Sequence, residues 1–109
     1  PAPQMWRLST IIKNGIPMIH PPNIHPGRVL LDELDERSIT QSALAQNIGV
    51  LSKTVNEICR AKRGISAEMA VKLSLALGAS PQFWMNLQTQ WELSQVDAQS
   101  MKKIKPIAA

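Results

Sequence analysis

The chain has 109 residues and a formal net charge of +4, so it has room for one domain with its own core but not for two. Its single cysteine, Cys59, excludes an intrachain disulfide, and no apolar run is long enough to span a bilayer. The stretch 1–22 lacks an uninterrupted apolar segment followed by a small-residue cleavage site, so we expect no secretory signal and a cytoplasmic protein.

The charges are distributed unevenly along the chain. Residues 32–37 are mostly acidic, whereas the segment 53–63 has one acid, Glu57, among four basic residues: Lys53, Arg60, Lys62 and Arg63. A basic cluster next to an acidic helix predicts a polarised surface, with a polyanion such as nucleic acid on one side. A solvated face is the alternative for any basic run, and charge alone does not decide between the two.

The first helix is preceded by a stretch without regular structure. Residues 1–24 are predicted to form a flexible N-terminal arm, because prolines are frequent there and no hydrophobic period persists. The helix itself is expected at 26–37, where a proline occupies the first turn and the apolar face consists of Val29, Leu30 and Leu34.

The next two helices are short. Thr40 is the expected N-cap of a helix that runs to about Asn47, and Gly49 ends it in a left-handed conformation. Ser52 is the expected N-cap of the third helix, whose buried face consists of Val55, Ile58 and Cys59.

Two longer helices complete the domain. The fourth is predicted from its N-cap, Ser66, to Leu77. The fifth begins at Ser80 and Pro81, a cap followed by a proline at the first helical position, and is expected to extend as far as Ala98. The predicted organisation is therefore an all-α, five-helix domain over 25–98, followed by a basic C-terminal tail over 99–109.

The second and third helices match the pattern of a helix-turn-helix. Their close approach requires a small residue, Ala45, and the sharp turn favours Gly49 four residues later. Val55 returns an aliphatic side chain to the same pocket, and Ile58 extends the contact. This spacing predicts a DNA-binding unit whose second helix enters the major groove with its N-terminus first.

This geometry assigns roles to ten polar residues. On the outward face of the recognition helix, five are expected to read bases: Ser52, Lys53, Thr54, Asn56 and Glu57. Lysine donates to guanine, asparagine pairs with adenine, glutamate accepts from a cytosine amino group, and threonine meets a thymine methyl or a phosphate. The other five begin the preceding helix or follow the recognition helix, and are expected to contact phosphates: Gln41, Ser42, Arg60, Lys62 and Arg63.

The fifth helix carries an aromatic and apolar face of Phe83, Trp84, Leu87 and Trp91. This face either packs the helix onto the rest of the core or contributes to a dimer interface, where aromatic residues are enriched. Both interpretations remain open from the sequence.

Catalytic and metal chemistry find no support. His20 and His25 lie in a proline-rich stretch without the further ligands that zinc requires, and no nucleophile–base pair or phosphate loop is present. We therefore expect no metal, no cofactor and no enzymatic activity.

Six short motifs mark the stretch from His25 to about Leu93. They are Pro22-x-x-His25-Pro26-Gly27, Leu44-Ala45-x-x-Ile48-Gly49-Val50, Val55-Asn56-Glu57-Ile58, Lys62-Arg63-Gly64-Ile65-Ser66, Met69-Ala70-x-x-Leu73 and Ser80-Pro81-x-Phe83-Trp84-x-Asn86-Leu87-Gln88. Through them, about two thirds of the chain resembles the HigA antitoxin family, also called virulence-associated protein I, among the lambda-repressor-like (XRE-type) regulators. Leu51 departs from the usual pattern, because small or polar residues are common at its position.

The resemblance implies a homodimer that binds double-stranded operator DNA in its own promoter. It also implies neutralisation of a partner toxin, HigB, a ribosome-dependent mRNA endonuclease. A helix-turn-helix regulator with no toxin partner is one alternative, and a protein-interaction module that has lost DNA binding is another. The basic residues of 53–63 argue against the second alternative.

Overall fold

The computed structural model describes residues 24–108, and within them it contains five α-helices, one short 3₁₀ helix and no strand. The helices are α2 (Pro26–Glu36), α3 (Gln41–Ile48), α4 (Ser52–Cys59), α5 (Ala67–Leu77), α6 (Pro81–Ser94) and η1 (Ala98–Met101). The predicted all-α, five-helix architecture is confirmed. Apart from Ile24, the predicted N-terminal arm lies outside the described residues.

Local sequence signals explain where most helices begin and end. The side-chain oxygens of Thr40, Ser66 and Ser80 each accept a hydrogen bond from the backbone N–H three residues later, as predicted for N-caps. Gly49 and Gly78 end α3 and α5 at φ values of 75° and 90°, where a side chain would be strained.

One predicted cap and one predicted helix end were wrong. The helix α4 begins at Ser52, but Ser52 is its first residue and the N-cap is Leu51, whose side chain makes no capping hydrogen bond. The last helix ends at Ser94 instead of Ala98, and η1 follows after a break. Beyond residue 94 the chain extends past the other helices, so no core contact holds it in a continued α-helix.

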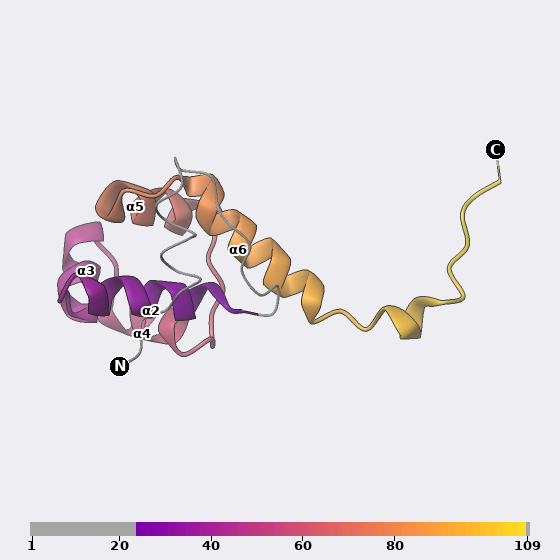
Figure 1. The fold of residues 1–109 in the computed structure, drawn as a ribbon, viewed down its shortest axis with the longest axis horizontal. Helices are drawn as coiled ribbons and strands as arrows, with labels where there is room; N and C mark the ends of the chain where they lie inside the picture. The colour runs from indigo at the N-terminus through magenta and orange to yellow at the C-terminus, as the bar shows by residue number, and fades with distance from the viewer. Residues whose placement is uncertain (1–23, 109) are drawn as a thin grey trace.

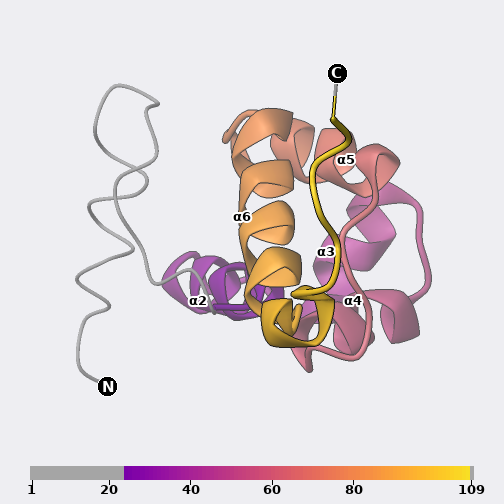
Figure 2. The same cartoon turned by 90° about the vertical axis from the view of Figure 1, so that its right-hand side faces the viewer.

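The core lies among all five α-helices, because α5 packs against α3 and α6, and α4 packs against α2 and α3 (Figure 1). Figure 2 shows α6 crossing in front of the other helices. Each leucine or valine buried in this core stabilises the folded chain by roughly 1.5–3 kcal/mol relative to an exposed one. The buried apolar side chains are Val29, Leu30, Leu34, Leu44, Ala45, Val55, Ile58, Ile65, Met69, Ala70, Leu73, Leu77, Phe83, Trp84 and Leu87.

Two close contacts fix the recognition helix and the loop after it. Gly27 of α2 lies so close to the end of α4 that a Cβ at this position would overlap the carbonyl oxygen of Ile58. From α6, the buried Gln88 accepts a 2.7 Å hydrogen bond from the backbone N–H of Ile65 and donates one of 2.9 Å to Glu92. Helices α2 and α6 therefore hold α4 and the loop 60–65 from two sides.

The chain after α6 leaves the helical body. The segment 95–108 carries η1 and then runs away from α2–α5 (Figure 1). Its apolar side chains are exposed, including Val96, Met101, Ile104 and Ile107. None of the helices in residues 24–108 is long and apolar enough to cross a membrane.

Candidate nucleic-acid interface

Helices α3 and α4 form the helix-turn-helix. The backbone N–H of Val50 donates a 3.0 Å hydrogen bond to the carbonyl of Ala45, which closes the turn at Gly49. Ala45 and Val55 expose 1% and 0% of their surface. Both residues are therefore buried, as expected for the predicted contact between the two helices. Ile58 is also fully buried. The opposite face of α4 is left for polar side chains.

The first turn of α3 is joined to the first two turns of α4 by side-chain hydrogen bonds. Asn56 Nδ2 donates to Gln41 Oε1 at 3.1 Å, and Ser52 Oγ donates to Ser42 Oγ at 3.3 Å. Each bond links a residue expected to read bases with one expected to contact phosphate. The structure therefore brings the two predicted groups onto one surface, in a defined mutual orientation.

A second link joins α4 to the loop that follows it. Arg63 donates from Nε and Nη2 to Glu57 Oε1, at 3.0 and 2.8 Å. The hydrogen bonds from Arg63 lower the pKa of the Glu57 carboxyl, and the positive charges of Arg63, Lys53 and Lys62 lower it further. Glu57 is thus a paired carboxylate, and a cytosine amino group would have to compete with Arg63 for it.

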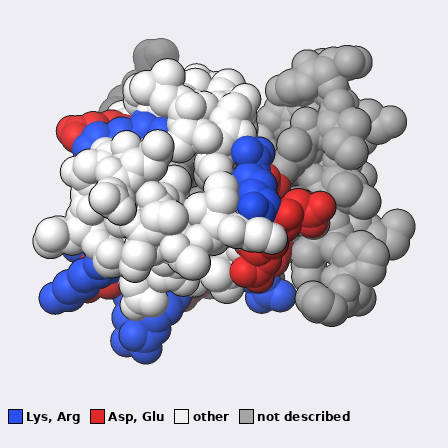
Figure 3. Space-filling view, turned by 90° about the vertical axis from the view of Figure 1, so that its left-hand side faces the viewer, with Lys and Arg blue, Asp and Glu red and all other residues white. Residues whose placement is uncertain are grey.

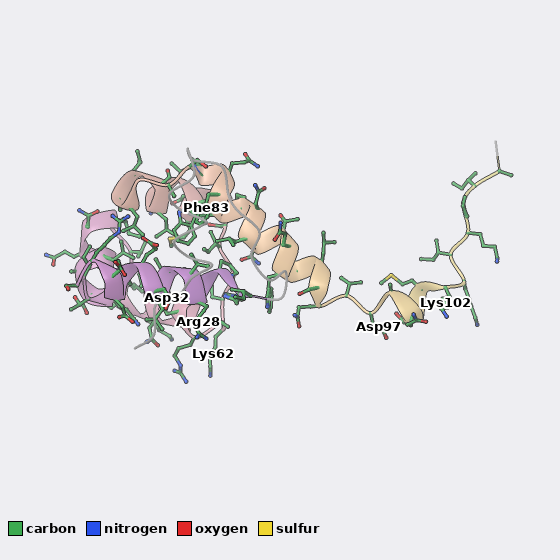
Figure 4. The ribbon with its side chains drawn as sticks, in the orientation of Figure 1. Arg28, Asp32, Lys62, Phe83, Asp97 and Lys102 are labelled. Atoms are coloured by element: carbon green, nitrogen blue, oxygen red, sulfur yellow. The ribbon has the colours of Figure 1, made fainter. Side chains whose placement is uncertain are left out.

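The basic residues of the interface lie along one edge of the domain. Lys53 is exposed on α4, and Thr54 is half-buried beside it. Figure 3 shows lysine and arginine atoms projecting along the lower edge of the molecule, and Figure 4 places Arg28 and Lys62 on that edge. The exposed basic residues from the sequence prediction are Lys53, Arg60, Lys62 and Arg63.

Arg28 has a place at the interface that was not apparent from the sequence. This exposed residue follows Gly27, whose contact with Ile58 brings the start of α2 to the end of the recognition helix. The arginine therefore joins the basic edge from a different helix. The signal that would have identified it is the glycine, since glycine allows backbones to approach closely.

The thiol of Cys59 faces inward from α4. It is half-buried, and burial, assisted by the negative charge of Asp35, raises its pKa to about 11. Cys59 is therefore part of the packing of α4, as the sequence predicted. Residues 24–108 contain no cluster of three or more histidine, cysteine or acidic side chains that would hold a metal ion.

Comparison with known proteins identifies the family. A helix-turn-helix family model, HTH_3, matches residues 30–84. The virulence-associated protein A' of Dichelobacter nodosus is 40% identical over 89 residues, which are 81% of this chain and 76% of that protein. The antitoxin HigA-1 of Vibrio cholerae is 34% identical over 77 residues, 68% of this chain and 72% of the antitoxin. The chain belongs to the helix-turn-helix family of HigA antitoxins and virulence-associated proteins.

Solved HigA-type structures have the same fold. The Pseudomonas aeruginosa antitoxin HigA, solved with the higBA promoter, superposes with a TM-score of 0.72 at 44% identity. That match covers 79% of this chain and 99% of the antitoxin. The antitoxin GraA, solved in complex with its operator, has a TM-score of 0.69 at 36% identity, and the match covers 84% and 95% of the two chains.

In this HigA-type chain, the aromatic face of α6 belongs mainly to the core. Phe83, Trp84 and Leu87 expose 5%, 0% and 1% of their surface, and Figure 4 labels Phe83 near the start of α6. The suggestion that these three contribute to a dimer interface is therefore corrected, because their side chains are already covered within one chain. Trp91 is half-buried and packs against the ring of His25, edge to face, at 4.7 Å.

His25 has a structural role that sequence reasoning missed. Its Nδ1 accepts a 2.9 Å hydrogen bond from the backbone N–H of Gly27, so it is the N-cap of α2. Burial lowers the pKa of the imidazole, which favours the neutral form required for this acceptor. The proline that follows it, at the first helical position, was the available signal for a cap at this residue.

Proposed function

We propose that this chain is a DNA-binding antitoxin that represses its own promoter and neutralises a partner mRNA endonuclease toxin of the HigB type. The observation that carries the proposal is the pair of hydrogen bonds, Asn56–Gln41 and Ser52–Ser42, at the outer surface of the helix-turn-helix. They arrange polar side chains of both helices on one surface beside a basic edge. Relatives with the same fold were solved with promoter or operator DNA, which supports this assignment.

The residues divide into two roles in the proposed complex. Ser52, Lys53, Thr54 and Asn56 read base edges from the first two turns of the recognition helix, where side chains reach the floor of the major groove. Glu57 contributes to reading only if Arg63 turns from it to a phosphate. The remaining residues position the protein on phosphates: Gln41, Ser42, Arg60, Lys62 and Arg63, with Arg28 added from the structure.

The proposed repressor is a homodimer, and its contact surface lies at the end of α6 and beyond. Leu93 exposes 68% of its surface and Ile104 74%, with Val96 and Met101 between them. Exposed apolar stretches of this kind mark interaction surfaces. A twofold dimer places two recognition helices about one DNA turn apart, roughly 34 Å, and requires a palindromic operator.

We infer that the chain acts by binding, without catalysis, in the cytoplasm where its operator lies. The relatives are DNA-binding regulators and antitoxins, which supports a role other than that of an enzyme.

Fluorescence anisotropy tests the repressor function. Labelled DNA from the region upstream of the coding sequence is compared with a scrambled duplex across a salt series. We expect tight binding to the upstream DNA only, weakened by Lys53→Ala and Asn56→Ala but unaffected by Gln90→Ala on the exposed side of α6. Equal, weak binding to both duplexes would reject a specific repressor.

The toxin function needs a separate test. The protein encoded beside this chain is co-expressed with it, and ribosome-dependent mRNA cleavage is measured with and without the chain. Loss of cleavage on addition of the chain supports the antitoxin function. If the chain binds its upstream DNA specifically but the neighbouring protein has no such nuclease activity, the chain is a transcriptional regulator with no toxin partner.

The oligomeric state is measured by analytical ultracentrifugation. Leu93→Asp and Ile104→Asp are each expected to give a monomer with weakened operator binding. The control is Gln99→Asp, at an exposed polar position in the same segment, which should leave the dimer intact. A dimer unaffected by both apolar substitutions would place the interface elsewhere.

A further inference from the structure

The start of the recognition helix differs from the starts of the other four α-helices. The helices α2, α3, α5 and α6 each begin with a side chain that accepts a hydrogen bond from a backbone N–H of the first turn. In α4 the corresponding residue is Leu51, which makes no such bond. Leucine is a poor N-cap, because it has no acceptor for the unpaired N–H groups.

Leu51 does not compensate by packing. Its side chain exposes 72% of its surface, while the neighbouring Val50 is half-buried and Val55 is fully buried. A leucine this exposed at a cap position contributes no capping hydrogen bond and little apolar burial to the folded chain. Its side chain is therefore available to a ligand.

The position of Leu51 indicates which ligand. Its carbonyl accepts the first helical hydrogen bond of α4, from Thr54, and the next residue, Ser52, is tied to Ser42 at the outer surface. Leu51 thus lies at the end of the recognition helix that enters the major groove first. The edge that an apolar side chain recognises there is the C5 methyl group of thymine, which the other bases lack.

We propose that Leu51 is a specificity-determining residue that contacts a thymine methyl group in each operator half-site. This inference rests on the proposed DNA-binding function and adds one base preference to it. Leu51 distinguishes thymine from cytosine or uracil by apolar contact alone. Thr54 is the other residue expected to meet a thymine methyl or a phosphate, so substitution of Leu51 itself must separate the two contributions.

The experiment uses the full chain and synthetic duplexes that together cover the upstream DNA segment to which the chain binds. In each duplex one thymine is replaced by deoxyuridine, which removes the methyl group and keeps every hydrogen-bonding group. For the unsubstituted protein, we expect at least one position per half-site where the replacement weakens binding about fourfold, the value of one buried methyl group. At the position that Leu51 contacts, Leu51→Ser should bind the thymine and deoxyuridine duplexes equally, whereas a loss that arises from Thr54 should persist.

The serine variant also provides the control for folding. Serine supplies the missing cap, so Leu51→Ser should melt at the same temperature as the unsubstituted protein or higher. Leu75→Ser removes an exposed leucine from α5 and should keep the full thymine preference.

Two outcomes would overturn the proposal in distinguishable ways. Specific binding of the upstream DNA with no loss at any deoxyuridine, or with every loss unchanged in Leu51→Ser, rejects the role of Leu51 alone. Binding that does not distinguish upstream from scrambled DNA rejects this role together with the repressor function.

Discussion

The amide nitrogen of Asn56 donates a 3.1 Å hydrogen bond to the amide oxygen of Gln41, which ties the recognition helix to the first residue of the helix before it. Because each side chain orients the other, their contributions to DNA binding should be coupled. We expect Gln41→Ala and Asn56→Ala each to weaken operator binding by ~1 kcal/mol or more. The double variant should lose less than the sum, by at least ~0.5 kcal/mol, in a double-mutant cycle measured by anisotropy. Strictly additive losses would mean that the two residues act independently.

Gly27 should be intolerant of alanine. The added Cβ would overlap the carbonyl oxygen of Ile58, a backbone atom that cannot rotate away. We expect Gly27→Ala to lower the free energy of unfolding by ~2–3 kcal/mol, through forced separation of α2 and α4. Gly49→Ala is the comparison, because nothing lies within 4 Å of its Cβ position and only the left-handed backbone is strained, at a cost of ~1–2 kcal/mol. Urea denaturation measures both, and a fully stable Gly27→Ala would show that the helices are not packed this closely.

Gln88 should stabilise the loop between α4 and α5. Replacing it by leucine leaves the buried N–H of Ile65 without an acceptor, which costs ~1–3 kcal/mol of stability. Operator affinity should also fall, since this loop carries Lys62 and Arg63. The control is Gln90→Leu, two residues along α6 on its exposed side, which should change stability by less than ~0.5 kcal/mol. Equal effects of the two substitutions would remove any special role for Gln88.

Stability should decrease in mildly acidic solution because of His25. Its pKa is lowered in the folded chain from an unfolded value of 6.5, so the unfolded chain binds a proton more readily. The stabilisation is complete above pH 6.5 and is lost as the pH falls toward the lowered folded pKa. Protonation of Nδ1 also removes the acceptor for Gly27 N–H. In His25→Asn the cap acceptor remains and does not titrate, so thermal melts between pH 7.5 and 5.5 should show a smaller decrease. Parallel curves for the two proteins would argue against this role.

The helices could be predicted because their ends depend on local chemistry. Thr40, Ser66 and Ser80 cap first turns, and Gly49 ends α3, through interactions within a few residues of sequence. The end of α6 was harder to place, because no glycine or proline lies close after Ser94 and the helix stops where its packing stops. The predicted cap of α4 was wrong by one residue. Serine is a favoured N-cap and leucine is not, so the sequence pointed to Ser52, although the N-cap is Leu51.

The candidate site was only partly predictable. Its residue types and their approximate face followed from helical spacing. The pairs Asn56–Gln41 and Glu57–Arg63 did not, because the angle between α3 and α4 and the path of the following loop decide which side chains meet. Gln88 carried a detectable signal, since it lies one helical turn after the buried Trp84 and so falls on the inward face of α6.

The burial of Cys59 also determines how the protein responds to oxidants. With a pKa of about 11, the thiol is ionised in only about one molecule in ten thousand at pH 7, and the thiolate is the form that peroxides and alkylating reagents attack. The recognition helix therefore carries the chain's single cysteine in a form that peroxides and alkylating reagents attack slowly. We expect operator binding by the proposed repressor to be unchanged by mild peroxide treatment, because the thiol that could be modified is held protonated within the packing of α4.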